Sequence, residues 1–391
     1  MAEPPLAGVR VVDLSRVLAG PYCTMLLGDL GADVVKVELP GAGDETRTWG
    51  PPFVAGESAY YLAVNRNKRS VALDLRDERA HAAFLRLVEN ADVVVENFRH
   101  GGAEALGVDY DRVRTVNQRI VYCSISGFGR REPAARPGYD FVVQAESGLM
   151  SINGDDDGPP FKVGVAVVDV LAGLNAATAI LAALHRRERT GEGDRVEVSL
   201  LDSALSALVN VAQSTLVTGD EAHRRGNAHP SIAPYQPLRA ADGEIAVAAA
   251  NDGLFAKLAQ ALGRPDLVDD PRFTTNADRV AHRLELAAEL ERTLSTRPVD
   301  EWLELLGAAG VPAGRIRGVR EALEAAAAAG EPPTVLVEHP SVGTVPLVRT
   351  APRFSSAGEQ QALPPPLLGQ HTREVLAEAG LAPAAIDAIA G

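Results

Sequence analysis

The sequence predicts a large doubly wound (Rossmann-like) α/β domain followed by a smaller α+β domain. Short apolar runs alternate with amphipathic segments through the first half of the chain, which is typical of strand–helix–strand units and a parallel sheet. Composition then changes at residues 221–236, which are rich in His, Arg, Gly and Pro, as linkers often are. From residue 243 one strand pattern is followed by several helical patterns, which indicates a second, smaller domain.

The elements of the large domain follow in order along the chain. A first apolar strand over residues 9–14 leads through a turn into a helix over residues 22–30, which Gly31 ends. The later strands are expected at residues 33–39, 70–75, 92–97, 120–125 and 196–200. The later helices are expected at residues 77–89, 110–116, 169–189 and 202–216. Ligands of such a sheet bind at the carboxyl ends of its strands.

We divide the chain into four segments. They are the first part of the large domain (1–205), a linker (206–236), the small domain (237–330) and a final linker with a C-terminal segment (331–391). Pro332 and Pro333 end the helical run of the small domain. Residues 335–348 are expected as strand or loop, and residues 372–379 as a last amphipathic helix.

Composition limits the possible functions. The chain has 391 residues and a net charge of -14, which argues against nucleic acid and anionic membranes as partners. The two cysteines, Cys23 and Cys123, have no metal-ligand spacing, so we expect buried thiols in a reducing, cytoplasmic compartment and no metal site. We also expect neither a signal peptide nor a membrane span.

One stretch, residues 158–173, carries a candidate nucleophile. Asp169 interrupts its apolar run, and the Ala/Leu pattern that continues to Leu184 predicts a helix with Asp169 near its start. The helix dipole favours an anion there, and flanking valines keep water scarce. A lightly hydrated carboxylate that stays ionised is a usable nucleophile. The alternative is an aspartate that only caps backbone N–H groups.

Polar loops next to the strands suggest a site for a phosphorylated ligand. Arg16, Val17 and Leu18 follow the first strand, residues 65–69 precede the third, and residues 96–100 follow the fourth. We place all three loops at one sheet edge, where the two basic loops would suit phosphate groups. The alternative is ordinary solvated surface charge.

The chain resembles a known family, the class III CoA-transferases, also called CaiB/BaiF, over essentially its whole length. The segments that carry the resemblance are 14–21, 27–32, 36–38, 67–70, 95–98, 138–140, 158–160, 164–173, 189–193 and 368–372. Segments 41–53, 60–62, 65–68 and 229–236 resemble the succinate–hydroxymethylglutarate branch of that family. This branch implies dicarboxylate substrates such as succinate and glutarate derivatives.

The resemblance implies a covalent mechanism on Asp169. In the family, the matching aspartate attacks the donor acyl-CoA, forms a mixed anhydride and then becomes an aspartyl-CoA thioester, which the acceptor acid uses in reverse. Coenzyme A and acyl-CoA are thus substrates, and no permanently bound cofactor is expected. The implied CoA contacts are Val17, Leu18, Asn67, Lys68, Arg69, Asn97, Phe98, Arg99 and Tyr139. Of these, Tyr139 could instead be a core aromatic.

The resemblance also implies an interlaced homodimer, in which the C-terminal segment returns to the large domain and the small domain of one subunit completes the active site of its partner. The glycine lid of the oxalate branch corresponds to residues 248–253, which are not poly-glycine, and its two arginines are replaced by Leu39-Pro40 and Ala105. An oxalate-type substrate is therefore disfavoured. Arg47, Arg66 and Arg99 are candidates for binding the remote carboxylate of a dicarboxylate, and the sequence does not choose among them.

Three alternative functions remain open. An intramolecular CoA-transferase, such as a mesaconyl-CoA isomerase, would use the same nucleophile without a free acceptor acid. An α-methylacyl-CoA racemase would need a general-base histidine after the turn at residues 126–129, and residues 130–141 contain none. A non-catalytic CoA-binding protein is the third alternative, and the intact sequence around Asp169 disfavours it.

Overall fold

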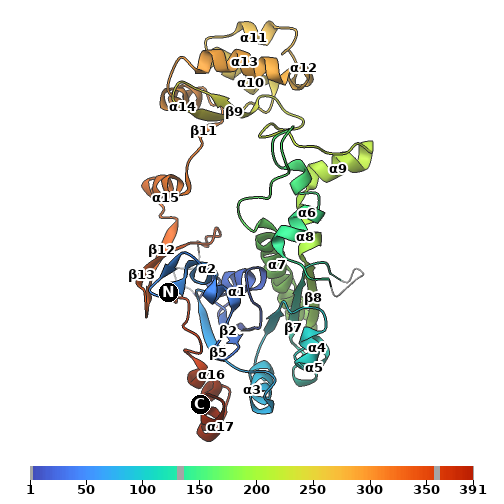
Figure 1. Ribbon diagram of the computed structural model, residues 1–391, viewed down its shortest axis with the longest axis vertical. Helices are drawn as coiled ribbons and strands as arrows, with labels where there is room; N and C mark the ends of the chain where they lie inside the picture. The colour runs from blue at the N-terminus through green and yellow to red at the C-terminus, as the bar shows by residue number, and fades with distance from the viewer. Residues whose placement is uncertain (1–2, 130–135, 356–361, 391) are drawn as a thin grey trace. The chain divides into compact units, whose positions relative to one another are not determined.

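The computed structural model describes residues 3–129, 136–355 and 362–390 (Figure 1). The chain divides into two compact units. The first comprises residues 1–149, 162–217 and 333–391, and the second comprises residues 150–161 and 218–332. Residues 206–217, which we expected in a linker, are mostly helical and belong to the first unit.

A six-stranded parallel sheet organises the first unit. Its strands are β1 (Arg10–Asp13), β2 (Asp33–Glu38), β5 (Lys68–Ala72), β6 (Val93–Glu96), β7 (Val121–Ser126) and β8 (Asp194–Ser199). They lie in the order β5-β2-β1-β6-β7-β8, and every neighbouring pair is parallel. The order reverses between β1 and β6, which is the switch point where doubly wound sheets bind ligands. The predicted parallel α/β fold is confirmed.

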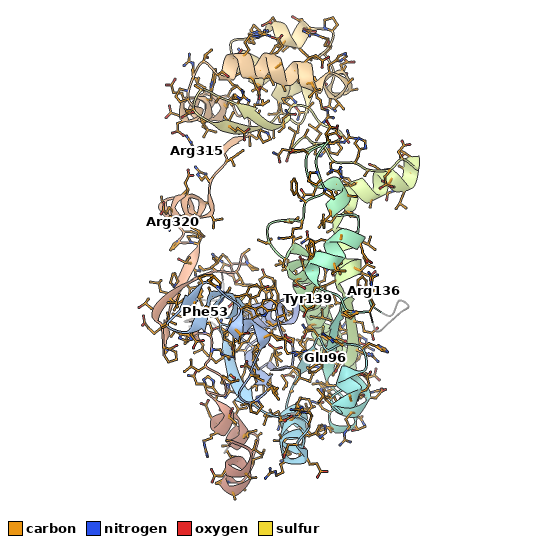
Figure 2. The ribbon with its side chains drawn as sticks, viewed as in Figure 1. Phe53, Glu96, Arg136, Tyr139, Arg315 and Arg320 are labelled. Atoms are coloured by element: carbon orange, nitrogen blue, oxygen red, sulfur yellow. The ribbon has the colours of Figure 1, made fainter. Side chains whose placement is uncertain are left out.

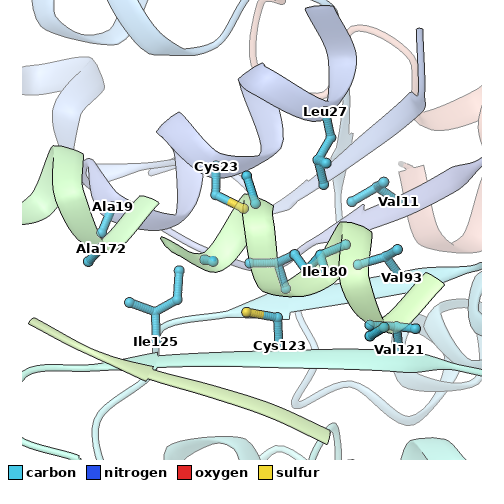
Figure 3. Packing of buried hydrophobic residues seen from close by; sticks show 14 of the residues in the cluster. Val11, Ala19, Cys23, Leu27, Val93, Val121, Cys123, Ile125, Ala172 and Ile180 are labelled. Atoms are coloured by element: carbon cyan, nitrogen blue, oxygen red, sulfur yellow. The ribbon is translucent and has the colours of Figure 1, made fainter. Parts of the chain in front are cut away.

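Helices cover both faces of this sheet. On one face, α1 (Ala19–Asp29) and α7 (Val167–Thr190) pack on alternate strand residues such as Val93 and Val121 (Figure 3). On the other, α3 (Glu78–Glu89), α5 (Tyr110–Val116), α16 (Thr372–Glu378) and α17 (Pro383–Ala390) pack on the intervening residues, including Val94 and Tyr122. Both faces of the central strands are buried, which explains why β1, β6 and β7 are largely continuous apolar runs, whereas the edge strand β8 alternates.

The long helix α7 is apolar because it lies in this core. Among the described residues it is the one helix with the length and hydropathy to cross a membrane, and the bent pair α8 (Leu200–Ala207) and α9 (Val209–Thr218) passes the same test when joined. In α7, Ala172, Ala176 and Ile180 are fully buried among the residues of α1 and the sheet. Packing inside a protein core accounts for its composition.

The remaining elements of the first unit are short. They are η1 (Glu45–Thr48), β3 (Phe53–Val54), β4 (Glu57–Ser58), α2 (Ala59–Val64), α4 (Gly102–Ala105), α6 (Asp140–Glu146) and the hairpin of β12 (Thr334–His339) and β13 (Gly343–Val348). The C-terminal segment lies along the edge strand β5, where the Ser70 hydroxyl accepts a hydrogen bond from the Gly369 N–H at 2.9 Å.

The second unit has its own small sheet and core. Strands β9 (Tyr235–Arg239), β10 (Glu244–Ala248) and β11 (Ala313–Arg315) are antiparallel in the order β11-β10-β9. Its helices are α10 (Asp252–Ala261), α11 (Asp266–Asp269), α12 (Asn276–Ala281), α13 (Arg283–Leu294), α14 (Val299–Ala308) and α15 (Val319–Ala328), and a short 3-10 turn, η2, spans Met150–Ile152. Phe255, Phe273 and Trp302 lie at the centre of its core.

The contact between α1 and α7 depends on a glycine. A Cβ atom on Gly173 would lie 2.7 Å from the Ala19 carbonyl oxygen, which is backbone and cannot move aside easily. We expect Gly173→Ala to lower the free energy of unfolding by about 1–3 kcal/mol. Gly307 in α14 is the matched control, since a Cβ there meets nothing within 4 Å, and Gly307→Ala should stabilise by about 0.5–1 kcal/mol. Urea unfolding of both variants measures this; equal effects would contradict the packing argument.

Candidate functional site

A cleft of about 800 Å³ opens at the carboxyl edge of the sheet, at the switch point between β1 and β6. Asp169 lines it. Of the predicted CoA contacts, the cleft is lined by Val17, Leu18, Asn97, Phe98, Arg99 and Tyr139. Glu96, Arg136 and Tyr139, which Figure 2 labels, belong to its wall. The topology therefore gathers the candidate nucleophile and most of the candidate ligand contacts in one place, all within the first unit.

Asp169 is the third residue of α7, as the helical pattern predicted. Its carboxylate is partly buried and, among the described residues, forms neither a hydrogen bond nor an ion pair. Burial and the neighbouring carboxylate of Asp140 raise its pKa to about 7. A poorly hydrated carboxylate without a counter-charge lowers the stability of the fold, but the same environment raises the reactivity of a carboxylate as a nucleophile.

Asp140, at the start of α6, caps the N-terminus of α7. Its Oδ1 accepts hydrogen bonds from the backbone N–H groups of Val168 at 2.8 Å and Asp169 at 3.4 Å. Its Oδ2 accepts one from Gln144 Nε2 at 2.6 Å, and the Gln144 Oε1 accepts the Val163 N–H at 2.9 Å. The capping role that we considered for Asp169 is therefore carried by Asp140, which leaves the Asp169 carboxylate free to face the cleft.

The loop after β1 is tied to the loop after β6 by Asn97. The Arg16 N–H donates to Asn97 Oδ1 at 2.8 Å, and Asn97 Nδ2 donates to the Arg16 carbonyl at 2.7 Å. Leu18 and the adjacent Val17 belong to an apolar cluster with Tyr60 and with Ala166, which immediately precedes α7. This cluster, which also includes Tyr22, Met25 and Val64, contacts the residue before the helix that carries Asp169 and presents an apolar surface there.

The three arginines proposed for a remote carboxylate differ sharply in the structure. Arg47 makes a bidentate ion pair with Glu38 and packs on the Tyr61 ring, with 3.8 Å to its centroid. Arg66 is buried and makes a bidentate ion pair with Asp29. Arg99 is exposed on the cleft wall, and its guanidinium has no partner in the part of the chain that the structure describes. Only Arg99 of the three is available to an anionic ligand.

The segment Asn67–Arg69 lies elsewhere, and our placement of three loops at one sheet edge is wrong. Residues that precede a parallel strand lie at its amino edge, opposite the edge where ligands bind. Lys68 is 1% exposed, and its ammonium contacts Asp13 Oδ2 at 3.1 Å. Arg69 makes a bidentate ion pair with Asp33 and a further pair with Glu378. These cations hold the sheet and the C-terminal segment together and do not line the cleft.

Tyr139 and Glu96 both line the cleft, but Tyr139 is exposed and Glu96 is buried. Tyr139 is 53% exposed, so the alternative of a core aromatic is wrong. Glu96 ends β6 and is buried, and its Oε2 accepts the Phe98 N–H at 2.8 Å. Burial raises the pKa of the Glu96 carboxyl.

Two further sequence predictions concern residues 130–135 and the candidate lid. Residues 130–135, where a racemase histidine was sought, are not among the described residues. The candidate lid segment belongs to the second unit, where Asn251 caps α10 and Asp252 forms an ion pair with the buried Arg279 at 2.7 Å. No cluster of three or more His, Cys, Asp or Glu residues with metal-binding geometry occurs in residues 3–129, 136–355 and 362–390.

Sequence reasoning missed Asp140, Gln144 and the buried ion pair of Lys36 and Asp44. The pairing of Lys36 could have been predicted from the sequence. A lysine in the middle of the apolar run Val34–Val37 is buried when helices cover both faces of the sheet, and a buried ammonium needs an acidic partner. Asp140 and Gln144 gave no comparable signal, because their roles depend on where the loop before α7 passes.

The buried charge of Asp169 leads to a stability prediction that needs no substrate. A carboxyl whose pKa is raised by folding favours the folded state when protonated, so it removes stability as pH rises from about 4 to about 7. We expect Asp169→Asn to raise the free energy of unfolding at pH 8 by about 1–3 kcal/mol and to have almost no effect at pH 4. Urea unfolding at the two pH values measures it; an equal effect at both would show that Asp169 is not a destabilising charge.

Comparison with known proteins identifies the family. Residues 6–372 match the model described as CoA-transferase family III. A mouse protein named succinyl-CoA:glutarate CoA-transferase is 44% identical over 375 residues, covering 96% of this chain and 86% of that protein. A succinate–glutarate CoA-transferase of Agrobacterium fabrum is 43% identical over 388 residues and covers 96% of both chains.

The solved structures agree with this result. The crystal structure of a CaiB/BaiF family protein from Brucella suis is similar to this chain with a TM-score of 0.85 and 43% identity, over 96% of this chain and 100% of that one. With the family match over nearly the whole length, the chain belongs to CoA-transferase family III, the CaiB/BaiF family, and is a CoA-transferase whose substrates are CoA thioesters.

Proposed function

We propose that this enzyme transfers CoA from a dicarboxylic acyl-CoA, such as succinyl-CoA, to a free dicarboxylic acid, such as glutarate, with Asp169 as the nucleophile. The observation that carries the proposal is the carboxylate of Asp169 in the cleft at the switch point, which has no partner in the part of the chain that the structure describes. The activities for which the mouse and Agrobacterium relatives are named support the choice of succinyl and glutaryl groups.

The proposed reaction exchanges bonds in four balanced steps. A carboxylate oxygen of Asp169 attacks the thioester carbonyl, the C–S bond breaks, and CoA leaves as thiolate, giving a mixed anhydride. The thiolate then attacks the Asp169 carbonyl carbon and releases the donor acid as carboxylate. The acceptor carboxylate attacks this aspartyl thioester, the C–S bond breaks, and CoA thiolate leaves again, giving a second mixed anhydride. The thiolate finally attacks the acceptor carbonyl, which forms the new acyl-CoA and releases Asp169 as carboxylate. No net proton is consumed, and the thioester energy is conserved.

The cleft has features that suit these steps. Poor hydration makes the Asp169 carboxylate more reactive, and the apolar cluster that contains Val17, Leu18 and Tyr60 would protect an anhydride from hydrolysis. A volume of about 800 Å³ lies in the usual range for small-molecule sites. Arg99 supplies a free cation for a ligand phosphate or for the remote carboxylate of a dicarboxylate.

We assign the CoA contacts according to the lining of the cleft. Val17, Leu18, Asn97, Phe98, Arg99 and Tyr139 are proposed to contact CoA or the acyl group. Asn67, Lys68 and Arg69 are instead proposed as structural residues, because their side chains bind Asp29, Asp13 and Asp33 and none of the three lines the cleft.

We also propose that the enzyme is an interlaced homodimer in the cytoplasm, as family resemblance suggests. Helix α9 supports an interface, because none of its residues is buried and Val209, Leu216 and Val217 are 68%, 78% and 71% exposed. Apolar side chains this exposed on one short helix are typical of a surface that a second chain covers.

The first test is a matrix of several acyl-CoAs against several free acids, read by mass spectrometry for exchanged CoA. We expect exchange between succinyl-CoA and glutarate, and a rate at least about 1,000-fold lower for Asp169→Asn with CoA binding retained. Turnover without a free acid would favour the intramolecular transferase, and deuterium uptake at the α-carbon of an acyl-CoA would favour the racemase. An Asp169→Asn variant with full turnover would refute the assigned nucleophile.

The second test uses pH. Since Asp169 must be ionised to attack, we expect kcat/KM to fall as pH drops through about 7. Asp140→Asn removes the neighbouring negative charge, lowers the pKa of Asp169 and should move this acid limb to lower pH by about half a unit or more. Asp74→Asn, at an exposed carboxylate paired with Arg76, is the control and should leave the limb in place. An unmoved limb in Asp140→Asn would exclude electrostatic control by Asp140.

A further inference from the structure

The loop between β1 and α1 contains a strained residue. Val17 has a φ of 70°, in the left-handed region that β-branched residues strongly avoid. Such conformations persist only where the surroundings hold them, and they are concentrated at functional sites. Val17 also lines the cleft and packs in the apolar cluster beside Ala166, at the start of the nucleophile's helix.

Side chains from other elements hold three consecutive residues of this loop. Lys36 Nζ, from β2, donates to the Ser15 carbonyl at 2.8 Å. Asn97, after β6, bonds both backbone groups of Arg16. Asp44 Oδ1 accepts the Val17 N–H at 3.3 Å. The backbone of residues 15–17 is thus held by hydrogen bonds to three side chains that are distant in sequence.

Lys36 and Asp44 form a buried pair behind this loop. Lys36 Nζ and Asp44 Oδ2 are 2.9 Å apart, and both side chains are 0% exposed. The Asp44 Oδ1 also accepts the N–H and hydroxyl of Thr46, at 3.0 and 2.8 Å. Burial opposes ionisation of Asp44, but Lys36 and Thr46 outweigh it and lower its pKa to about 2. Asp44 is therefore charged at every physiological pH, and its geometry is fixed.

We infer that Lys36 and Asp44 are positioning residues for acyl-CoA binding, which hold Val17 in its left-handed conformation so that Val17 and Leu18 form the wall of the cleft. The inference rests on the proposed function, because it assigns the loop to acyl-CoA. Neither residue lines the cleft. Their effect on the substrate passes through the backbone of Ser15 and Val17, so it should appear as weaker binding rather than as slower chemistry.

A double-mutant cycle between Asp44 and Val17 tests this inference. Asp44→Asn keeps an oxygen acceptor but removes the charge that holds Lys36. We expect the KM for acyl-CoA to rise about tenfold while kcat changes less than about threefold. Glycine adopts positive φ without strain, so in a Val17→Gly background the same Asp44→Asn change should raise KM by less than about threefold. A general loss of stability would not be relieved by Val17→Gly.

The matched control is Asp92→Asn, since Asp92 accepts the Arg10 N–H at 2.8 Å and pairs with Arg187 at 2.8 Å but lies at the amino edge of the sheet. It should lose stability without a change in KM. Should Asp44→Asn fail to fold, Lys36→Met combined with Asp44→Leu removes both members of the pair, so that neither is left buried without the other, and it should give the same rise in KM.

The outcomes separate this inference from the proposed function. An unchanged KM in Asp44→Asn, or an equal rise in both Val17 backgrounds, would overturn the positioning role while leaving CoA transfer intact. If the unaltered enzyme exchanged no CoA with any acid, the proposed function would fail. The Kd of each variant for CoA, measured by titration calorimetry, would then decide the positioning role. Asp44→Asn should raise this Kd more in the Val17 background than in the Val17→Gly background.

Discussion

Two carboxylates, Asp140 and Asp169, lie at the N-terminus of helix α7. The electrostatics of the cleft depend on which of them accepts hydrogen bonds from the backbone N–H groups of that helix. Asp140 takes them, with hydrogen bonds to Val168 and Asp169, and Gln144 fixes its other oxygen. Asp169 is left without a partner among the described residues and next to a like charge. A helix start normally stabilises one anion; here Asp140 accepts the N–H groups of Val168 and Asp169, and the Asp169 carboxylate accepts no hydrogen bond among the described residues.

A second group of buried charges supports the other wall of the cleft. Lys36, Asp44 and Asn97 hold the loop at Ser15–Val17, while Asp13, Lys68, Glu38 and Arg47 form ion pairs beneath it. Removing charged groups from water is costly unless each finds partners, so such a network tolerates few alternative loop conformations. Rigid walls beside the Asp169 carboxylate suit the proposed mechanism, in which the enzyme itself becomes covalently modified.

Much of the fold could be predicted because the apolar runs have the correct spacing. The strands at β1, β2, β6 and β7 and the helix containing Asp169 occur within a few residues of their expected positions.

The site was predicted less completely. Asp169 was singled out because it interrupts an apolar run at the start of a predicted helix, and the loops after β1 and β6 because ligands bind at the carboxyl edge of a parallel sheet. The Asn67–Arg69 segment was misplaced because its charge was considered without its position before a strand. Asp140 could not be found because its function depends on a contact across 28 residues of chain.

The edge strand β5 has a consequence for biosynthesis. Its outer side is covered by residues near the C-terminus: the His371 N–H donates to the Ser70 carbonyl at 2.9 Å, and the Ala72 N–H donates to the Thr372 hydroxyl at 3.0 Å. On a ribosome, the second unit is fully made while this strand still has exposed backbone groups. An exposed strand edge can pair with other chains, so a nascent chain is open to aggregation or to capture by a chaperone until residues 369–372 have reached β5.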